Sequence, residues 1–255
     1  MKKIFLTSLV AVFAVSAAQA SSAINDNPLY RPGSNQFYSM TSLMSHSENA
    51  DSWALTEQFG YGITDRMAVS VETSMDEGNW FDTNSWGPLT LGLDYRVLND
   101  ANWKADVYGS YTVNPVWGYG LSFLDENVTM YDWVVGVRAG YMTKMWTIAG
   151  HVEFDYRNTE SFNWGDDGWH SIRAGVDGFL SLNDNWALLI GAEYTGWLDD
   201  EFENAGTWDA KFGVNYNIDV NKFVAAYITS DMSHETGDWE VSDGFGFGAK
   251  FGIQF

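Results

Sequence analysis

Three side chains that can move a proton or hold a metal ion occupy alternate positions in one short segment: His151, Glu153 and Asp155. Alternate residues of a β-strand point to the same face, with Cβ atoms roughly 6–7 Å apart. On such a face the imidazole and the two carboxylates could ligate a metal ion or relay a proton. A structural histidine inside the protein is the simpler interpretation, and we favour it.

A second group of two acids and a histidine, Asp166, Asp167 and His170, follows in the next polar segment. Neither group matches a fixed catalytic motif, and no serine lies in a nucleophile context such as G-x-S-x-G. No calcium signature of fixed spacing is present, and the chain contains no Cys. The sequence therefore predicts no catalytic residues, no metal site and no cofactor.

The segment that carries His151 has the periodicity of a β-strand. From Trp146 to Tyr156 apolar and polar side chains alternate, so one face of the strand is apolar and the other is polar. The same pattern recurs along the chain. We predict twelve strands, at approximately 36–45, 53–62, 67–76, 88–97, 104–113, 131–141, 146–156, 170–180, 186–195, 207–217, 222–230 and 244–255.

Short turns and long polar loops alternate between these strands. Turn-forming Asn and Asp residues mark five short connections, at 64–66, 99–100, 143–144, 183–185 and 219–221. All short turns then fall at one end and all long loops at the other. This arrangement predicts an all-β fold, a single closed antiparallel up-and-down transmembrane β-barrel. A propeller blade would need four strands per repeat, and a secreted sandwich would carry a more uniformly charged polar face.

The first twenty residues have the composition of a secretory signal peptide. Two lysines precede an apolar run from Ile4 to Ala17, and Ala18-Gln19-Ala20 is a small-x-small cleavage site. We predict a signal peptide at 1–20, a periplasmic N-terminal segment at 21–35 and the barrel at 36–255. With 34 acids against 13 bases the chain would repel phosphate backbones, so nucleic acid is not expected as a partner.

Tryptophan residues begin many of the predicted strands. At a membrane surface an indole ring can lie in lipid while its N–H reaches the polar interface. The tryptophans that follow short turns are predicted to form an inner girdle: Trp103, Trp146 and Trp186. Those that follow long loops are predicted to form an outer girdle: Trp53, Trp133, Trp169 and Trp208.

One acid conflicts with a lipid-facing surface. The alternation within the strand at 53–62 directs Glu57 toward lipid, between Leu55 and Phe59. A carboxylate near the bilayer midplane is costly. We therefore expect a β-bulge or a shift of register at Glu57.

Two segments carry a resemblance to a known class of protein. They are GYGITDR at 60–66 and the final strand GFGFGAKFGIQF, which aligns Phe251, Ile253 and Phe255 on one face. With the signal peptide, they resemble Gram-negative outer-membrane β-barrel proteins of the porin-like kind. The resemblance implies location in the bacterial outer membrane, contact with its lipid and lipopolysaccharide, and recognition of the last strand by the barrel-assembly machinery. Lys250 departs from many such assembly signals, which carry Gly there.

The polar faces of the strands would line the barrel lumen, where acids and bases nearly balance. The charged and histidine residues predicted to line it are Glu72, Asp94, Arg96, Lys104, Asp106, Arg138, His151, Glu153, Asp155, Arg173, Asp177, Glu193, Asp209, Lys211 and Lys250. The six long loops, by contrast, contain 19 acids and no Lys or Arg. Such an acidic extracellular mouth attracts cations and repels anions.

These patterns favour a small porin-like channel for passive diffusion of small hydrophilic solutes, with a preference for cations and no enzymatic activity. Twelve strands leave room for a narrow pore, and we expect a monomer or a weak homo-oligomer. Two other hypotheses stay open. One is a surface barrel with a closed lumen that acts as an adhesin or a structural protein; the other, with less support, is an outer-membrane hydrolase that uses His151.

Overall fold

The fold is taken from a computed structural model of the chain. The structure describes seven segments, 24–45, 53–76, 88–115, 128–161, 165–199, 206–235 and 238–255. The predicted signal peptide at 1–20 and most residues of the six long loops lie outside these segments. No helix in the described segments is long and apolar enough to cross a membrane.

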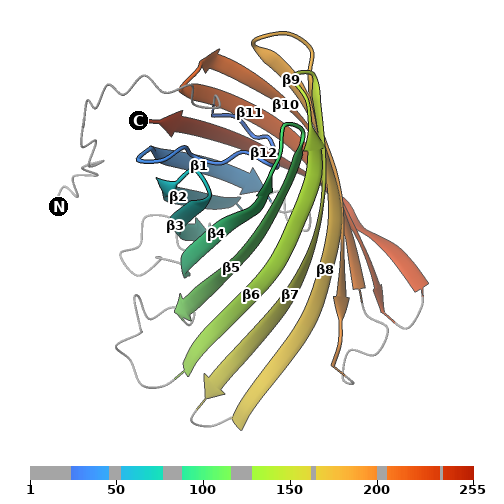
Figure 1. The fold of residues 1–255 in the computed structure, drawn as a ribbon. Helices are drawn as coiled ribbons and strands as arrows, with labels where there is room; N and C mark the ends of the chain where they lie inside the picture. The colour runs from blue at the N-terminus through green and yellow to red at the C-terminus, as the bar shows by residue number, and fades with distance from the viewer. Residues whose placement is uncertain are drawn as a thin grey trace, which may run out of the picture.

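Twelve antiparallel strands form one sheet that closes on itself (Figure 1). The strands are β1 (Phe37–Ser45), β2 (Trp53–Thr64), β3 (Met67–Asp76), β4 (Leu89–Asn99), β5 (Trp103–Pro115), β6 (Val128–Met142), β7 (Trp146–Ser161), β8 (Gly165–Ser181), β9 (Trp186–Trp197), β10 (Gly206–Asp219), β11 (Lys222–Glu235) and β12 (Asp238–Gln254). Each strand pairs with its neighbours in sequence, as the alternation of turns and loops predicts.

The barrel closes where the first strand pairs with the last. The β1–β12 register runs from Tyr38↔Gln254 to Met44↔Gly248. Beyond it, Phe37 and Phe255 exchange backbone hydrogen bonds, with the Phe255 N–H donating to the Phe37 carbonyl at 2.8 Å. The predicted closed, up-and-down barrel of twelve strands is confirmed.

Several strands are longer than the sequence predicts, and the excess lies at the loop end. β8 and β12 each contain 17 residues, whereas the apolar alternation covers only about ten residues of each. The apolar alternation marks only the part of a strand that faces lipid. Beyond the lipid the outward side chains need not be apolar, so the strand continues without the pattern. Ladder pairs continue beyond it, as in Val128↔Ser161 between β6 and β7.

The outer surface of the barrel is apolar, and the inner surface is polar except for an apolar cluster in which Phe179, Leu189 and Phe223 pack with Ile24. Side chains that alternate along each strand differ sharply in exposure; Leu91, Val135 and Ile190 on the outer surface are 50%, 65% and 64% exposed. Exposed aliphatic side chains on every side of a closed sheet cannot form a core. They form a band that is compatible only with a lipid environment.

Aromatic rings border this band at both ends. Near the short turns, Trp103 and Trp146 pack against Tyr141. Eight residues further along the ladder, Trp133 packs against Tyr111. Trp186 packs against Tyr216 near the short turns. Trp208 packs against Tyr194 near the long loops.

The structure does not place every predicted girdle tryptophan on the outside. In β8 the outward positions are those of Ile172 and Val176, which alternate with Arg173 and Asp177. Trp169 shares the inward register of Arg173, so it does not belong to the outer girdle. The sequence prediction failed because it considered only that Trp169 lies at the start of a strand. It did not consider that alternate positions of the strand face opposite sides of the sheet. The side chain of Trp53 lies outside the described residues.

Glu57 lies on the lipid-facing surface with no bulge or register shift, contrary to our expectation. Its pairs Thr41↔Glu57 and Glu57↔Thr73 are regular, and the irregularity in β2 occurs later, between Gly62 and Thr64. Two hydroxyl groups of β1 stabilise the carboxylate: Ser39 Oγ donates to Oε1 at 2.6 Å and Thr41 Oγ1 to Oε2 at 2.5 Å. Local hydrogen bonds thus replace part of the lost hydration.

The segment before β1 lies inside the barrel, not in the periplasm as the sequence suggested. Ile24 and Leu29 are 0% and 1% exposed, and Arg31 is 7% exposed. We refer to residues 24–35 as the strap. It runs across the short-turn end of the lumen before the chain enters β1.

Replacement of Glu57 by Leu tests the placement of this side chain. We expect Glu57→Leu to raise the free energy of unfolding of the barrel in lipid vesicles by about 1–3 kcal/mol, because it removes a charge from hydrocarbon. The matched control is Glu72→Leu in the lumen, which loses a 3.1 Å hydrogen bond from Gln58 and should destabilise. Urea titrations would measure both; a loss of stability in Glu57→Leu contradicts a lipid-facing carboxylate.

Candidate functional site

The charged residues predicted to line the lumen all occupy inward-facing register positions. They come from nine of the twelve strands and alternate with apolar residues on the lipid side: Glu72 on β3, Asp94 and Arg96 on β4, Lys104 and Asp106 on β5, Arg138 on β6, His151, Glu153 and Asp155 on β7, Arg173 and Asp177 on β8, Glu193 on β9, Asp209 and Lys211 on β10, and Lys250 on β12. Charge therefore surrounds the lumen on almost every side.

Near the short turns, Asp106 is the centre of an arginine cluster. Its side chain is fully buried and accepts hydrogen bonds from Arg96 Nε at 2.8 Å and from Arg138 Nη2 at 3.1 Å. Arg31 of the strap lies 3.4 Å from the same carboxylate. Asp94 accepts from Arg31 and Arg138, each at 3.3 Å. Three guanidinium groups thus share two carboxylates.

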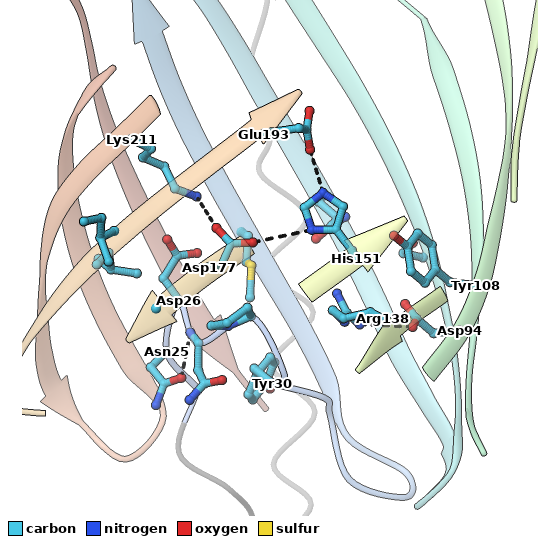
Figure 2. A pocket seen from close by; sticks show the side chains of 18 of the residues that line it. Asn25, Asp26, Tyr30, Asp94, Tyr108, Arg138, His151, Asp177, Glu193 and Lys211 are labelled. Carbon is cyan, nitrogen blue, oxygen red and sulfur yellow. Dashed lines mark hydrogen bonds and ion pairs between the residues drawn. The ribbon is translucent and has the colours of Figure 1, made fainter. Parts of the chain in front are cut away.

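His151 belongs to a second cluster, on the wall formed by β7 to β10. Its Nε2 lies 2.7 Å from Glu193 Oε2, and its Nδ1 lies 3.7 Å from Asp177 Oδ2. Lys211 Nζ is 3.9 Å from Asp177 on the other side. Figure 2 shows the imidazole between the two carboxylates, with Lys211 beyond Asp177.

The proton relay considered for His151, Glu153 and Asp155 is not formed by direct contacts. Glu153 instead accepts a 2.6 Å hydrogen bond from Tyr108 Oη and pairs with Arg173 at 2.9 Å. Asp155 lies 3.8 Å from the same guanidinium. His151 bonds across the sheet, to strands β8 and β9, and not along its own strand. The three side chains therefore share a face but act in separate ion pairs.

The second predicted group is not assembled as expected either. His170 occupies an outward position, where its ring packs on Phe154 and Tyr156. Its Nδ1 lies 2.9 Å from Asp199 Oδ1, just after β9. Hydrogen bonds from the His170 side chain and backbone hold the pKa of Asp199 below its ordinary value. The side chains of Asp166 and Asp167 lie outside the described residues.

Sequence reasoning missed the strap, which contributes polar groups to the same lumen. Asp26 pairs with Lys250 at 2.7 Å and accepts a hydrogen bond from Tyr227. Burial would raise the pKa of Asp26, but Lys250 and Lys211, together with these hydrogen bonds, lower it below the ordinary value. The Asp26 carboxylate is therefore charged at neutral pH.

Further hydrogen bonds attach the strap to opposite sides of the barrel. Asn27 Nδ2 donates to Thr147 Oγ1 of β7 at 2.8 Å. The carbonyl oxygen of Leu29 accepts from Arg96 of β4 at 2.9 Å. Tyr30 donates to Gln254 of β12 at 3.3 Å. In the sequence, the only indication that residues 24–35 lie inside the barrel is that they mix apolar and charged side chains without the periodicity of a strand.

A cavity of about 360 Å³ lies above the strap (Figure 2). Its floor is formed by the strap residues Asn25 to Pro28 and Tyr30. Its walls include the tyrosine rings of Tyr38 and Tyr108 and the charged groups of both clusters, among them Arg138, Glu193 and Lys211. The cavity can hold water or a small polar molecule, and charged groups of both signs line it.

Comparisons with known proteins agree with the fold of the barrel. No protein-family model and no curated protein sequence matches the chain. Among solved structures, the NanC porin superposes with a TM-score of 0.54 at 12% identity, covering 86% of this chain and 98% of that chain. The KdgM porin superposes with a TM-score of 0.50 at 10% identity, covering 86% and 99% respectively.

The closed sheet, the apolar exterior and the charged lumen define the class of the protein: it is a transmembrane β-barrel of the outer-membrane type. Within that class its fold is porin-like, as the similarity to NanC and KdgM shows. At this low identity the similarity shows the fold alone.

The buried carboxylate of Asp106 offers a test of the arginine cluster. We expect Asp106→Asn to lower the free energy of unfolding by about 3–5 kcal/mol, because it leaves three guanidinium groups with one carboxylate. The control, Asp184→Asn in the exposed β8–β9 turn, should change it by less than about 0.5 kcal/mol. Urea titration of the refolded barrels, followed by tryptophan fluorescence, would measure both. Equal stability of the two variants would contradict the cluster.

Proposed function

We propose that this protein is a porin-like channel for passive diffusion of small hydrophilic solutes, with a preference for cations. The observation that carries the proposal is a polar, charge-lined cavity enclosed by a barrel whose outer surface is apolar. Water and polar solutes partition into such a lumen, whereas the apolar exterior holds the barrel in lipid.

The charge of the lumen supports a preference for cations. Among the residues whose side chains the structure describes, ten carboxylates face the lumen or belong to the strap: Asp26, Glu72, Asp94, Asp106, Asp132, Glu153, Asp155, Asp177, Glu193 and Asp209. Eight basic side chains do so: Arg31, Arg96, Lys104, Arg138, Arg157, Arg173, Lys211 and Lys250. The excess of acids, together with 19 acids in the long loops, produces a negative potential that attracts cations.

A closed-lumen surface barrel, acting as an adhesin or a structural protein, is the second candidate. The strap favours it, because ion pairs on opposite walls hold the strap across the lumen. The hydrolase hypothesis loses support, since both ring nitrogens of His151 face carboxylates. Electrical recording separates the first two candidates, because a permanently closed barrel carries no current.

Assembly and partners are part of the same proposal. Phe251 on β12 and Phe255 directly after it face outward, and Ile253 shares the register of Phe251. An aromatic and aliphatic row of this kind, on the last strand, suits recognition by the barrel-assembly machinery. Outer-membrane lipid and lipopolysaccharide would then cover the exterior, and we propose a monomer or a weak homo-oligomer.

Reversal potentials in planar bilayers under a salt gradient test the cation preference. We expect the wild-type protein to conduct and to favour cations. The double variant Asp177→Asn, Glu193→Gln should lower the cation-to-anion permeability ratio by at least about fivefold, because each unit charge about 4 Å from an ion contributes about 1 kcal/mol in water, which alone is a factor of about five. The control Asp184→Asn, on an exposed turn, should leave the ratio unchanged. Absence of conductance in the folded protein rejects the channel, and a chloride preference rejects the charge argument.

A further inference from the structure

The barrel wall is shaped to receive the strap. At Gly62 of β2 a Cβ atom would collide with the carbonyl oxygen of Gly33. This close approach lets the Asn35 N–H donate to the Gly62 carbonyl at 2.7 Å, while the Gly62 N–H donates to the Gln36 carbonyl at 2.9 Å. A residue with a side chain at position 62 would push the strap away. The absence of a side chain there is therefore needed for the strap to lie as it does.

Charge complementarity fixes both ends of the strap. Near its start, the negative charge of Asp26 meets Lys250. Near its end, the positive charge of Arg31 meets Asp94 and Asp106. Each charge of the strap thus lies beside an opposite charge of the wall. Between them, Leu29 is buried, so the contact combines ion pairs with an apolar anchor.

The strap crosses the lumen at its short-turn end. The Ile24 N–H donates to the carbonyl of Val220, in the turn between β10 and β11. On the far side, the Ser34 N–H donates to Asp65 in the turn between β2 and β3, at 3.2 Å. The contacts with Thr147 and Arg96 lie between these two ends. The strap therefore spans the short-turn end of the lumen and forms the floor of the cavity.

The strap can leave without breaking the barrel. Up to residue 34, its recorded bonds to the wall are made with side chains or with turns, and no residue before Phe37 belongs to a strand. Closure of the sheet depends on the β1–β12 ladder, which starts at Tyr38↔Gln254. Ion pairs and side-chain hydrogen bonds can be exchanged for bonds to water, at a much lower cost than a ladder in lipid.

From these contacts we infer that the short-turn end of the lumen is a peptide-binding site whose ligand is the chain's own strap. When the strap is bound it closes the solute path at that end, and when it is released the path opens. The inference rests on the proposed channel function and deepens it, because it assigns opening and closing of the channel at the short-turn end to residues 24–35.

A reversible cross-link tests the inference in the full mature chain. The protein has no Cys, so the pair Asn27→Cys, Thr147→Cys can be joined by a short bis-thiosulfonate reagent and released by a reductant. These two side chains are in hydrogen-bond contact. We expect the cross-linked protein to stay at the lowest conductance level in planar bilayers, without opening transitions. Reduction should restore the transitions.

A second cross-link within the wall is the matched control. Thr90 of β4 and Thr112 of β5 have hydroxyl oxygens 2.9 Å apart in the lumen, away from the strap. The pair Thr90→Cys, Thr112→Cys carries the same chemistry but does not hold the strap. It should conduct like the wild-type protein both before and after reduction.

A charge-reversed strap gives the opposite result. The full chain with Asp26→Lys and Arg31→Glu should lose both anchoring contacts and show a severalfold higher mean conductance. Addition of the synthetic peptide INDNPLYRPGSN, which has the sequence of residues 24–35, should lower that conductance again. The same peptide with its Asp and Arg exchanged should have no effect.

The outcomes separate this inference from the channel proposal. If the protein conducts but the Asn27–Thr147 cross-link leaves its conductance unchanged, the strap does not close the path and the inference is wrong, while the channel stands. If the folded wild-type protein does not conduct, the channel proposal fails and the inference, which rests on it, fails with it. A low conductance in the cross-linked protein that reduction reverses supports both.

Discussion

The whole structure depends on one constraint, that every backbone N–H and C=O group in the lipid-facing band must be paired within the sheet. An open sheet would leave two unpaired edges, so the chain brings β1 against β12 and continues their pairing to the Phe37–Phe255 hydrogen bonds. Closure then separates the two faces of every strand. One face contacts lipid and must be apolar, and the other encloses a space that lipid cannot enter. The charged lumen is a consequence of that closure, because charged side chains have no comparable place on the outside.

Glu57 shows how strict this separation is and what an exception requires. It is the one carboxylate that the described strands direct to the outer surface between the aromatic girdles. Ser39 and Thr41 of the adjacent strand both donate to it, and Thr73 lies opposite it on β3. Most of the inward carboxylates, by contrast, obtain guanidinium or ammonium partners, as Asp106 does from Arg96. Hydroxyl donors suffice for one acid on the outside, whereas the lumen holds many acids only because it also holds bases.

The sequence predicts the barrel well because the barrel is built from local rules. A period of two and the Asn- and Asp-rich turns are each legible within ten residues, which is why the strand order, the turn positions and the inward parity of residues such as Asp94 and Lys211 could be predicted. Other features depend on contacts between distant segments. The strap takes its position from pairs such as Asp26–Lys250, 224 residues apart, and His151 takes its partners from β8 and β9. Periodicity contains no information about either. The prediction for Trp169 failed for a simpler reason. It was based on the residue type, whereas the alternation of positions along the strand determines which face a side chain occupies.

The low identity to NanC and KdgM, 12% and 10%, follows from the same physics. Contact with lipid requires apolar side chains on the outer face but not particular apolar residues, and backbone pairing does not depend on side-chain identity. Many sequences therefore form the same barrel. Selectivity must therefore come from the lumen, where individual side chains matter. In this chain the strap and the wall line one cavity together, with Asp26 and Tyr30 on one side and Glu193 and Lys211 on the other. A solute in that cavity touches the strap directly. If its contacts differ between the bound and the released strap, solute binding and strap position are coupled, because a ligand shifts an equilibrium by its difference in affinity for the two states.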